Sequence, residues 1–358
     1  MNIGFLIYGK LSRRTGGYLY DTKLVEYLTK KDDHVKIISL PNKQYFDNIQ
    51  YSFSSHLFNR LKKLDVDVFL QDVMCYPTLF FVNRRLKQDT DIRLISIVHN
   101  LKQYETQNNQ DNFAVRFFEK QYLETIDDFI FISNTARKSV EDILQNSVSG
   151  LVVLPGKDHL VPKNRKKVTK SYCQNQRLKL VFVGNLFPNK GLHVLLRSLS
   201  TIDTDKWILT VIGDPNVDKK YTLKIQKLIH NLKLENNVFF KGFVSRSRLS
   251  RYFENNHLLA VPSYYESLGI VYIEALGFAL PVIASQNGGT IEIITHEEEG
   301  YLVSPGDFST LRKYINNIIK NPQILIRLSR KASERYKNLP TWNKSMGKIW
   351  KFIHSIYE

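Results

Sequence analysis

Short apolar runs alternate with amphipathic stretches along almost the whole chain of 358 residues. Such runs are typical of buried parallel strands, and the amphipathic stretches between them are typical of helices that cover a sheet. One helix is predicted over 21–31, where Leu24, Tyr27 and Leu28 share a face, and another over 113–126. Six strands of the first half are predicted from the runs NIGFLIYG, HVKIISL, VDVFL, RLISIVHN, DFIFISN and LVVLPG. The pattern predicts an open parallel α/β sheet.

A second series of the same kind follows a basic, polar stretch with little periodicity. Its predicted strands are 178–184, 207–213, 237–244, 258–263, 281–286 and 300–305, with a helix over 221–233 between the second and third of them. From Asp307 onward the pattern predicts only helix, and the chain finishes with TWNKSMGKIWKFIHSIYE. The expected domains are therefore 1–160, a linker over 161–177, a second domain over 178–340 and a C-terminal helix over 341–358. Two open sheets side by side form a cleft at the carboxyl ends of their strands, where ligands bind in this architecture.

Composition agrees with two globular domains in a reducing compartment. Hydrophobic residues make up 43% of the chain, enough for two packed cores. The two cysteines, Cys75 and Cys173, are far apart, which argues against a disulfide framework or a cysteine zinc site. The apolar run in MNIGFLIYGK is far too short for a signal peptide, and no window reaches the roughly 18 apolar residues of a membrane helix. A soluble, cytoplasmic protein is expected.

The formal net charge of +17 is confined almost entirely to the second half of the chain. Residues 1–160 carry 21 Lys/Arg against 19 Asp/Glu, whereas residues 161–358 carry 30 against 15. Two explanations of this excess are open. The basic residues could form solvated helix faces, or they could serve peripheral association with the inner face of an anionic membrane. Nucleic acid is not expected as a partner, because no zinc-finger spacing or aromatic RNA-binding signature accompanies the charge.

The segment PSYYESLGIVYIEALGFALPVIASQNGGTIE, at 262–292, contains the strongest constellation of polar and glycine residues. A strand is predicted to end at Ser263 and a helix to run from near Ser267 to about Phe278. The first-turn backbone N–H groups at Leu268, Gly269 and Ile270 would form an anion site suited to a diphosphate. Gly269 would let the ligand approach the backbone closely.

Two glutamates lie in this segment, eight residues apart. Along a helix that spacing separates Glu266 and Glu274 by roughly 12 Å, too far to share one proton or one metal ion. The two carboxylates suit hydroxyl-rich groups at either end of an elongated ligand, as in a nucleotide-sugar. The alternative is that one glutamate caps the helix and the other is an exposed helical residue without a role.

The segment resembles the donor-binding signature of the retaining glycosyltransferases of family four, the glycosyl transferases group 1. The matching residues are Pro262, Ser263, Glu266, Gly269, Glu274, Gly277, Pro281, Val282, Gly288, Gly289 and Glu292. The resemblance implies an α/β fold of the GT-B type, with two Rossmann-like domains that face a cleft and a C-terminal helix that crosses back to the first domain. It also implies that Glu266 contacts hydroxyls of the transferred sugar and Glu274 the ribose, while backbone groups at Leu268–Ile270 hold the phosphates. Ser267 is a further predicted donor-binding residue.

The resemblance continues on both sides of that segment. VFVGNLFPNKGLHVLLRSL, at 181–199, is similar to the first strand, loop and helix of the family's donor domain. It implies that Gly184 and Lys190 meet the diphosphate, while Asn185 stands where the family usually has an arginine, so the leaving diphosphate has one cation fewer. The stretch 240–253 resembles the part that contacts the base, which makes Phe243 and Val244 candidate neighbours of the nucleobase.

In the first half, Gly16 and Gly17 are predicted to lie just before a helix and resemble the family's Gly-Gly loop facing the donor. His99 stands where the family has a histidine that contacts the donor sugar. As single residues, the glycines would be an ordinary turn and the histidine a strand-end residue with a backbone hydrogen bond. Ser133 and Asn134 could touch an acceptor or cap the next helix. No G-x-G-x-x-G is present near Gly16, which counts against a nicotinamide or flavin site.

The implied chemistry is transfer of a sugar, of the hexosyl type, from a nucleotide-diphosphate-sugar to an unidentified acceptor with retention at the anomeric carbon. No Asp-x-Asp pair adjoins the predicted phosphate site, so no metal and no cofactor is expected, and UDP is favoured over GDP as the carrier. Glu266 and His99 are the predicted catalytic residues, positioning the sugar, and domain closure would complete the site. The alternatives are a degenerate transferase that only binds its ligand, motivated by Asn185, and a sugar-nucleotide epimerase.

Overall fold

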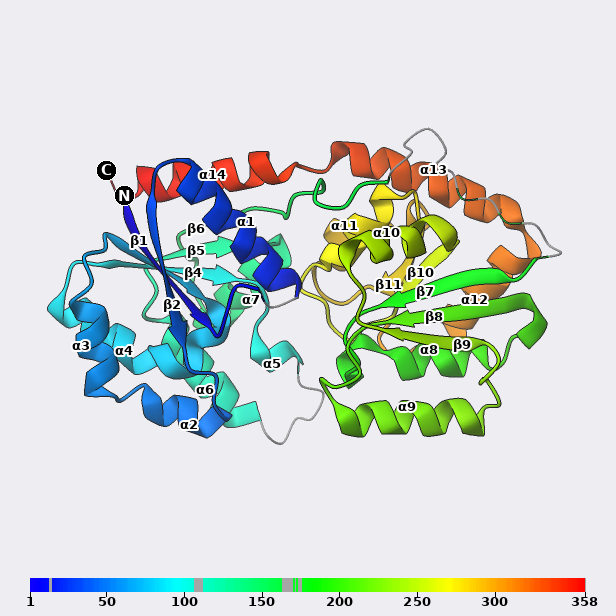
Figure 1. Ribbon diagram of the computed structural model, residues 1–358, viewed down its shortest axis with the longest axis horizontal. Coiled ribbons are helices and arrows are strands. Elements are labelled where there is room, and N and C mark those ends of the chain that lie inside the picture. The colour runs from blue at the N-terminus through cyan, green and yellow to red at the C-terminus, as the bar shows by residue number, and fades with distance from the viewer. Residues whose placement is uncertain (13–14, 106–111, 163–169, 171, 173–175, 358) are drawn as a thin grey trace. The chain divides into compact units, whose positions relative to one another are not determined.

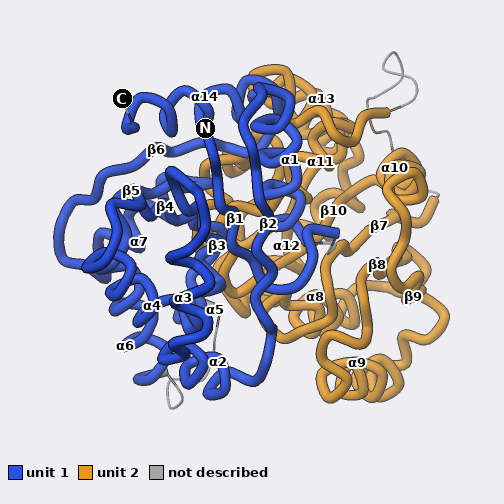
Figure 2. The backbone as a smooth tube through the Cα atoms, turned by 60° about the vertical axis from the view of Figure 1, so that its left-hand side comes forward, with its two compact units in different colours: residues 1–156, 340–358 blue, residues 157–339 orange. Residues whose placement is uncertain are grey.

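A computed structural model of the chain describes residues 1–12, 15–105, 112–162, 170, 172 and 176–357 (Figure 1). It divides into two compact units, residues 1–156 with 340–358, and residues 157–339 (Figure 2). Most of the predicted linker, together with Cys173, lies outside the described residues. Each unit is built around one six-stranded parallel sheet, so the predicted α/β class is confirmed.

The sheet of unit 1 has the strand order β2-β1-β3-β4-β5-β6. Its strands are β1 (Asn2–Tyr8), β2 (His34–Leu40), β3 (Val68–Asp72), β4 (Arg93–Val98), β5 (Asp128–Phe131) and β6 (Gly150–Val152). The order reverses between β1 and β3, which are hydrogen-bonded neighbours with a helical connection on either side. In open α/β sheets, ligands bind at the carboxyl ends of the strands where the order reverses.

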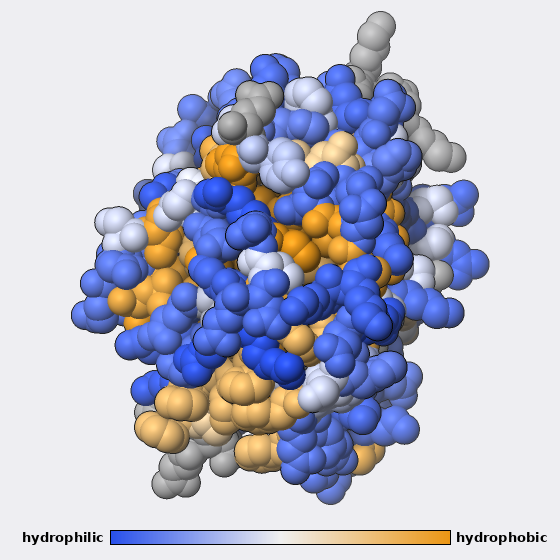
Figure 3. Space-filling view, turned by 90° about the vertical axis from the view of Figure 1, so that its left-hand side faces the viewer, coloured by the Kyte–Doolittle hydropathy of each residue, from blue (hydrophilic) through white to orange (hydrophobic). Residues whose placement is uncertain are grey.

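Helices cover both faces of this sheet, because the strands are apolar on both sides and must be shielded from water (Figure 1). They are α1 (Gly16–Lys30), α2 (Tyr45–Tyr51), α3 (Ser55–Lys62), α4 (Tyr76–Asp89), α5 (Lys102–Glu105), α6 (Asn112–Leu123) and α7 (Asn134–Leu144). Helices α2, α3 and α6 all pack against α4 and form one layer with it. On the outer surface of this layer apolar side chains are exposed, visible at the lower edge of Figure 3.

The sheet of unit 2 has the order β12-β11-β10-β7-β8-β9. The strands are β7 (Leu178–Val183), β8 (Trp207–Ile212), β9 (Val238–Gly242), β10 (Leu258–Val261), β11 (Val282–Ser285) and β12 (Gly300–Val303). The accompanying helices are α8 (Leu192–Leu199), α9 (Lys219–Asn231), α10 (Arg246–Asn255), α11 (Ile270–Gly277), α12 (Phe308–Lys320) and α13 (Pro322–Asn338). Read from β9, the order is 3-2-1-4-5-6 along the chain, that of a dinucleotide-binding sheet, with its reversal between β7 and β10.

The last helix, α14 (Trp342–Ser355), returns to unit 1 and packs on α1, as the predicted fold requires. Trp342 lies edge-on to Tyr20 of α1, with ring centroids 5.8 Å apart. A Cβ on Gly156 would stand 2.1 Å from the Trp342 backbone nitrogen, so only glycine fits beneath the start of α14. Near its end, Trp350 Nε1 donates to Asp33 Oδ2 at 3.1 Å, and the Met1 ammonium pairs with the same carboxylate.

Two sequence expectations need correction at this level. The run HVKIISL was predicted as a buried strand, but β2 is an edge strand, and only Ile38 and Leu40 of its seven residues are buried. An apolar run carries no signal for its position in the sheet. The helix predicted over 21–31 begins five residues earlier, at Gly16, because the side chain of Thr15 accepts from the Tyr18 N–H and caps it. No helix among the described residues is both long and apolar enough to cross a membrane.

Candidate active site

In unit 2, three neighbouring strands end in glycine at one edge of the sheet. Gly184 follows β7, Gly213 follows β8 and Gly242 ends β9; the Gly184 N–H donates to Ile212, and the Gly213 N–H donates to Gly242. A Cβ on Gly213 would stand 1.9 Å from the Gly184 carbonyl oxygen, so the two loops are packed backbone to backbone. This carboxyl edge therefore presents backbone with little side-chain cover, as a phosphate-binding edge requires.

The loops that follow β7 and β10 meet at this edge through an ion pair. Lys190, at the end of a 3-10 turn over Pro188–Lys190, places its Nζ 2.6 Å from Glu266 Oε2. Ser263 Oγ donates to the same carboxylate oxygen at 3.2 Å. The two charged side chains keep 20% and 13% of their exposure, so the pair is accessible from solvent. The predicted sugar contact and the predicted diphosphate contact are thus direct neighbours.

Asn189 joins the same two loops, and sequence reasoning missed it. Its carboxamide Nδ2 donates to the Tyr265 carbonyl at 2.9 Å, while its Oδ1 accepts from the Tyr265 N–H at 3.1 Å. Its carbonyl oxygen also accepts from the Tyr264 N–H at 2.7 Å. Asn189 is buried; it directly precedes Lys190, and it binds the residue that directly precedes Glu266. These bonds therefore fix Lys190 and Glu266 relative to one another.

The segment before helix α11 differs from the prediction. The helix was expected near Ser267 but starts at Ile270, with Gly269 as its N-cap at φ +85° and ψ +82°. Glu266 is held in extended backbone instead, because it forms a parallel bridge with Gly288, where a Cβ would stand 2.1 Å from the Glu266 carbonyl oxygen. Ser267 and Leu268 are therefore buried loop residues, and the N–H groups of the first helical turn begin at Ile270.

Glu274, in the middle of α11, has a partner that the sequence did not indicate. His159 Nε2 lies 2.7 Å from Glu274 Oε1, and the histidine side chain is almost completely buried. The pair is separate from Lys190 and Glu266 in its contacts. The two carboxylates of the segment therefore occupy different environments, as their eight-residue spacing predicted.

The remaining donor-side candidates lie at the same edge of the sheet. Asn185 Oδ1 accepts from the Asp214 N–H at 3.3 Å and so ties the loop after β7 to the loop after β8. Phe243 follows β9 and is 48% exposed, whereas the neighbouring Val244 is buried. Of these two residues, only Phe243 exposes its side chain to solvent.

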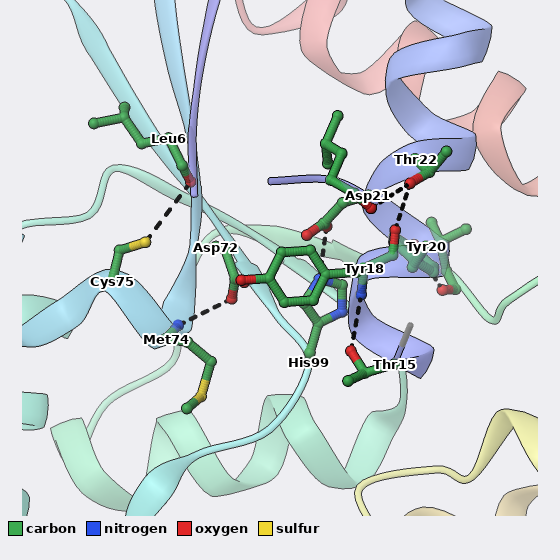
Figure 4. Close-up of polar contacts among 12 residues, drawn as sticks. Leu6, Thr15, Tyr18, Tyr20, Asp21, Thr22, Asp72, Met74, Cys75 and His99 are labelled. Carbon is green, nitrogen blue, oxygen red and sulfur yellow. Dashed lines mark hydrogen bonds and ion pairs between the residues drawn. The ribbon is translucent and has the colours of Figure 1, made fainter. Parts of the chain in front are cut away.

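In unit 1 a buried histidine–carboxylate cluster lies where the strand order reverses (Figure 4). His99, directly after β4, places its Nε2 2.7 Å from Asp21 Oδ1 on helix α1. Asp72, the last residue of β3, accepts from the Met74 N–H at 3.0 Å and lies close by. All three side chains are buried, and within the described residues His99 Nδ1 and Asp21 Oδ2 have no hydrogen-bond partner.

The charges in this cluster shift its pKa values. Burial lowers the pKa of His99, but the charge of Asp21, its hydrogen bond and the charge of Asp72 together raise it more, so the pKa is raised overall. Burial and the Asp21 charge raise the pKa of Asp72 to about 6, against the smaller opposing effects of His99 and the Met74 N–H. The cluster thus favours an imidazolium held by one carboxylate beside a second that releases its proton reluctantly.

Gly17 makes room for the His99 ring. A Cβ at this position would stand 3.3 Å from ring atoms Cγ and Cδ2, closer than packed side chains normally approach. The two glycines do not precede the helix as predicted: Gly16 and Gly17 are the first two residues of α1. Tyr20 stands edge-on to the same ring, with centroids 5.4 Å apart. Helix α1 therefore holds His99 in three ways: Asp21 pairs with its Nε2, Gly17 leaves room for its ring, and Tyr20 packs edge-on against it.

Ser133 caps helix α7, since its Oγ accepts from the Ala136 N–H at 3.0 Å. This favours the capping alternative for Ser133 over an acceptor contact; Asn134 is the exposed first residue of that helix. Among the residues that the structure describes, no group of three or more His, Cys, Asp or Glu is arranged to hold a metal ion.

Comparisons with known proteins show which family and which fold this chain is similar to. Residues 163–337 match the family described as glycosyl transferases group 1. An uncharacterized glycosyltransferase of Haemophilus influenzae is 24% identical over 311 residues, covering 84% of this chain and 80% of its own length. A D-inositol 3-phosphate glycosyltransferase of Streptomyces avermitilis is 28% identical over 160 residues. The match covers 43% of this chain and 34% of the length of that protein.

Two solved structures share the fold over nearly the whole chain. Sucrose-phosphate synthase of Thermosynechococcus elongatus has a TM-score of 0.84 at 20% identity and covers 99% of both chains. Anabaena HepE in complex with UDP and glucose has a TM-score of 0.78 at 18% identity, over 99% of this chain and 100% of its own. The family match therefore assigns residues 163–337, in the unit that holds Lys190 and Glu266, to the glycosyl transferases group 1, and the two solved structures show that the chain has the GT-B fold.

Proposed function

We propose that the chain transfers a hexose from a nucleotide-diphosphate-sugar, UDP-linked in preference to GDP-linked, with retention at the anomeric carbon and without a metal ion. The observation that carries the proposal is the Lys190–Glu266 ion pair between the loops after β7 and β10. The structures of HepE in complex with UDP and glucose and with UDP-glucose support the choice of nucleotide. The acceptor and the linkage are left open.

The ion pair suggests how the donor enters. A diphosphate is a stronger partner for Lys190 than a single carboxylate, so donor binding would exchange Glu266 for phosphate at the ammonium. Glu266, still close by, would then accept hydrogen bonds from hydroxyls of the sugar. Lys190 and the first N–H groups of α11 would stabilise the charge that develops on the leaving diphosphate.

In this mechanism the acceptor hydroxyl attacks from the face that the diphosphate leaves. The bond from the anomeric carbon to the phosphate oxygen breaks as the bond to the acceptor oxygen forms, and the acceptor proton passes to the departing phosphate. No protein base is needed, so Glu266 and His99 act as catalytic residues by holding the sugar. Glu274 would bind the ribose and Phe243 would face the base.

A panel of nucleotides and nucleotide-sugars in a thermal-shift assay tests the donor, and product analysis by NMR tests the anomeric configuration. We expect the largest stabilisation with UDP and a UDP-hexose, and turnover that persists in a metal chelator. Stabilisation by GDP-sugars alone, inversion at the anomeric carbon or complete loss of turnover on chelation would each contradict its part of the proposal.

A second candidate function is ligand binding without turnover. It is motivated by Asn185, which is uncharged where the family usually has an arginine and whose Oδ1 is engaged with the Asp214 N–H. In this case nucleotide-sugars would stabilise the protein but neither hydrolysis nor transfer would occur. Detectable release of UDP from a UDP-sugar by the purified chain rules this candidate out.

The net positive charge of the chain is compatible with peripheral association with a membrane. The basic second half would favour an anionic membrane surface through long-range attraction, without specifying which part of the surface makes contact.

A further inference from the structure

Helix α6 of unit 1 exposes a stripe of alternating aromatic and basic side chains. Phe113, Arg116, Phe117 and Lys120 are all exposed and follow one another at i, i+3, i+4 and i+7, which places them on one face of the helix. Phe113 is 83% exposed and Phe117 47% exposed. A helix of a soluble domain normally turns such residues toward its core, so this face is built for a contact outside the domain.

The stripe continues into a larger aromatic surface over α2 and α4. Phe46 of α2 is 67% exposed, and Phe53, just beyond that helix, is 52% exposed. Ring contacts connect these elements through the pairs Phe113–Phe117, Phe117–Phe118, Phe118–Phe80, Phe80–Phe53, Phe53–Phe81 and Phe46–Tyr45. Tyr45 Oη then donates to the Ala114 carbonyl at 3.3 Å and links α2 to α6. We call the exposed members Phe46, Phe53, Phe113 and Phe117 the aromatic patch.

The helical layer that carries the aromatic patch is basic, although the first half of the chain is nearly neutral. Residues 41–63, 76–89 and 112–124, which hold α2, α3, α4 and α6, carry nine Lys/Arg against four Asp/Glu. The remainder of residues 1–160 carries 12 against 15. One of the four acids, Glu119, is buried and accepts from the Lys102 N–H at 2.7 Å, so it does not offset the surface charge. The positive charge of this half is thus concentrated around the exposed rings.

We propose that the aromatic patch docks the protein on an anionic lipid bilayer. Phenyl rings reach the boundary between headgroups and acyl chains, while Arg116 and Lys120, on the same face of the helix, extend to the lipid phosphates beside them. Anionic headgroups match the charge of the layer, and each Lys or Arg near such a surface strengthens binding roughly fivefold. Figure 3 shows the apolar atoms gathered on this face with polar atoms bordering them.

A second copy of the chain fits the same surface less well. A two-fold contact places the same surface on both partners, so it would bring two positively charged layers together around the rings. An anionic bilayer removes this repulsion and accommodates rings of any arrangement, because lipid has no fixed shape to match.

Vesicle cosedimentation of the full chain tests the proposal. The wild type is expected to bind vesicles of phosphatidylcholine and phosphatidylglycerol more tightly than phosphatidylcholine alone. F113S/F117S should lower the binding constant for the mixed vesicles by about tenfold or more, because two rings lose their burial. R116Q/K120Q should lower it by roughly fivefold per charge and have little effect on phosphatidylcholine vesicles.

The matched control lies in unit 2, where Phe239 and Phe240 of edge strand β9 are 42% and 40% exposed. F239S/F240S should bind vesicles like the wild type, and unchanged thermal unfolding of each variant shows that it is folded. The proposal is overturned by wild-type vesicle binding in F113S/F117S, by an equal loss in F239S/F240S, or by a wild type that binds no vesicles. Sedimentation velocity without lipid tests whether a second copy of the chain occupies the aromatic patch. A wild-type dimer that is dissociated by F113S/F117S would overturn the lipid assignment in favour of a self-contact.

A reporter in the stripe gives a second, independent reading. Phe113→Trp should shift its emission to the blue with mixed vesicles and be quenched by lipids brominated in the acyl chains, after subtraction of the wild-type signal. Phe239→Trp should do neither. Quenching of Phe239→Trp instead of Phe113→Trp would assign membrane contact to unit 2 and refute the proposal.

Discussion

One ion pair in each unit lies where the strand order of its sheet reverses, and these two pairs differ in their access to solvent. In unit 2 the Lys190 and Glu266 side chains keep 20% and 13% of their exposure. In unit 1 His99 keeps 9% and Asp21 none. A pair open to solvent can exchange one partner for a ligand, whereas a buried pair holds its geometry and resists separation, since an isolated buried charge is costly. If the donor binds as proposed, it would open the Lys190–Glu266 pair, the open pair, and leave the His99–Asp21 pair, the closed pair, intact.

The largest effect on turnover is expected from removing the charge of Glu266 in the open pair. Glu266→Gln keeps the size of the side chain but leaves Lys190 without its carboxylate, and it weakens the hydrogen bonds to the sugar. Turnover should fall by about 100-fold or more, while UDP affinity stays equal or rises because phosphate no longer competes with a carboxylate. Steady-state kinetics and isothermal titration with UDP measure the two effects.

Glu298→Gln is the matched control for this change. Glu298 is also in unit 2 and pairs with a lysine, Lys331, at 3.0 Å, but both side chains are more than 40% exposed. It should leave turnover and UDP affinity at wild-type values. Wild-type turnover in Glu266→Gln would remove the open pair from the mechanism.

Second in size is a stability effect in the closed cluster. The folded-state pKa of Asp72 is raised to about 6, above its ordinary value of 3.8, so the folded protein holds this proton more tightly than the unfolded chain. That stabilisation is fully present below pH 3.8 and is lost as the pH rises through 6. Asp72→Asn should therefore stabilise the protein at pH 8, by about 1–3 kcal/mol.

Thermal unfolding at pH 5 and pH 8 measures this difference. At pH 5 Asp72 is mostly protonated in the folded protein but mostly ionised in the unfolded chain, so the asparagine variant should be more stable than the wild type there by about half as much as at pH 8. Asparagine can still accept from the Met74 N–H, which keeps the local geometry. Destabilisation at pH 8 would mean that the ionised carboxylate is better accommodated than its burial indicates.

Much of the fold could be predicted from the sequence, because it depends on local periodicity. The twelve strands of the described residues coincide with predicted apolar runs, because most of them are buried parallel strands that need apolar side chains on both faces. The position of an edge strand such as β2 could not be predicted, because neighbours in the sheet are set by long-range pairing. The start of α11 was misplaced for the same reason: the bridge from Glu266 to Gly288 keeps those residues out of the helix.

Individual site residues were predictable only where a motif surrounded them. Glu266 and Lys190 belong to such motifs, but their pairing spans 76 residues and has no local signal. Asn189 and His159 were missed because each acts through a partner distant in sequence. Asp21 did leave a signal: it shares a helix face with Leu24 and Leu28, so it puts an acid on an otherwise apolar stripe. A carboxylate in that position needs a buried partner, and His99 is that partner.

A third and smaller effect should follow from weakening the closed pair. Asp21→Asn preserves the shape of the side chain but removes the charge that raises the pKa of His99. The imidazole of the variant then loses its proton at lower pH, so turnover should fall about tenfold at pH 8 and less at pH 6. The pH profile separates this effect from simple loss of structure, which would lower turnover equally at both values.

The smallest effect on turnover is expected from displacing the His99 ring of the closed pair by a few tenths of an ångström. Gly17→Ala places a methyl group 3.3 Å from the His99 ring, so the ring must shift by a few tenths of an ångström. Gly17 has no positive φ, so alanine suits the helical backbone and should leave stability unchanged or raise it by up to about 1 kcal/mol. Turnover should nevertheless fall by roughly two- to fivefold, because a displaced imidazole meets the sugar at a poorer distance. Kinetics and thermal unfolding on the same preparation measure both. If turnover is unchanged while stability rises, His99 has freedom that its burial and its 2.7 Å contact with Asp21 do not suggest, and its predicted role against the sugar would have to be given up.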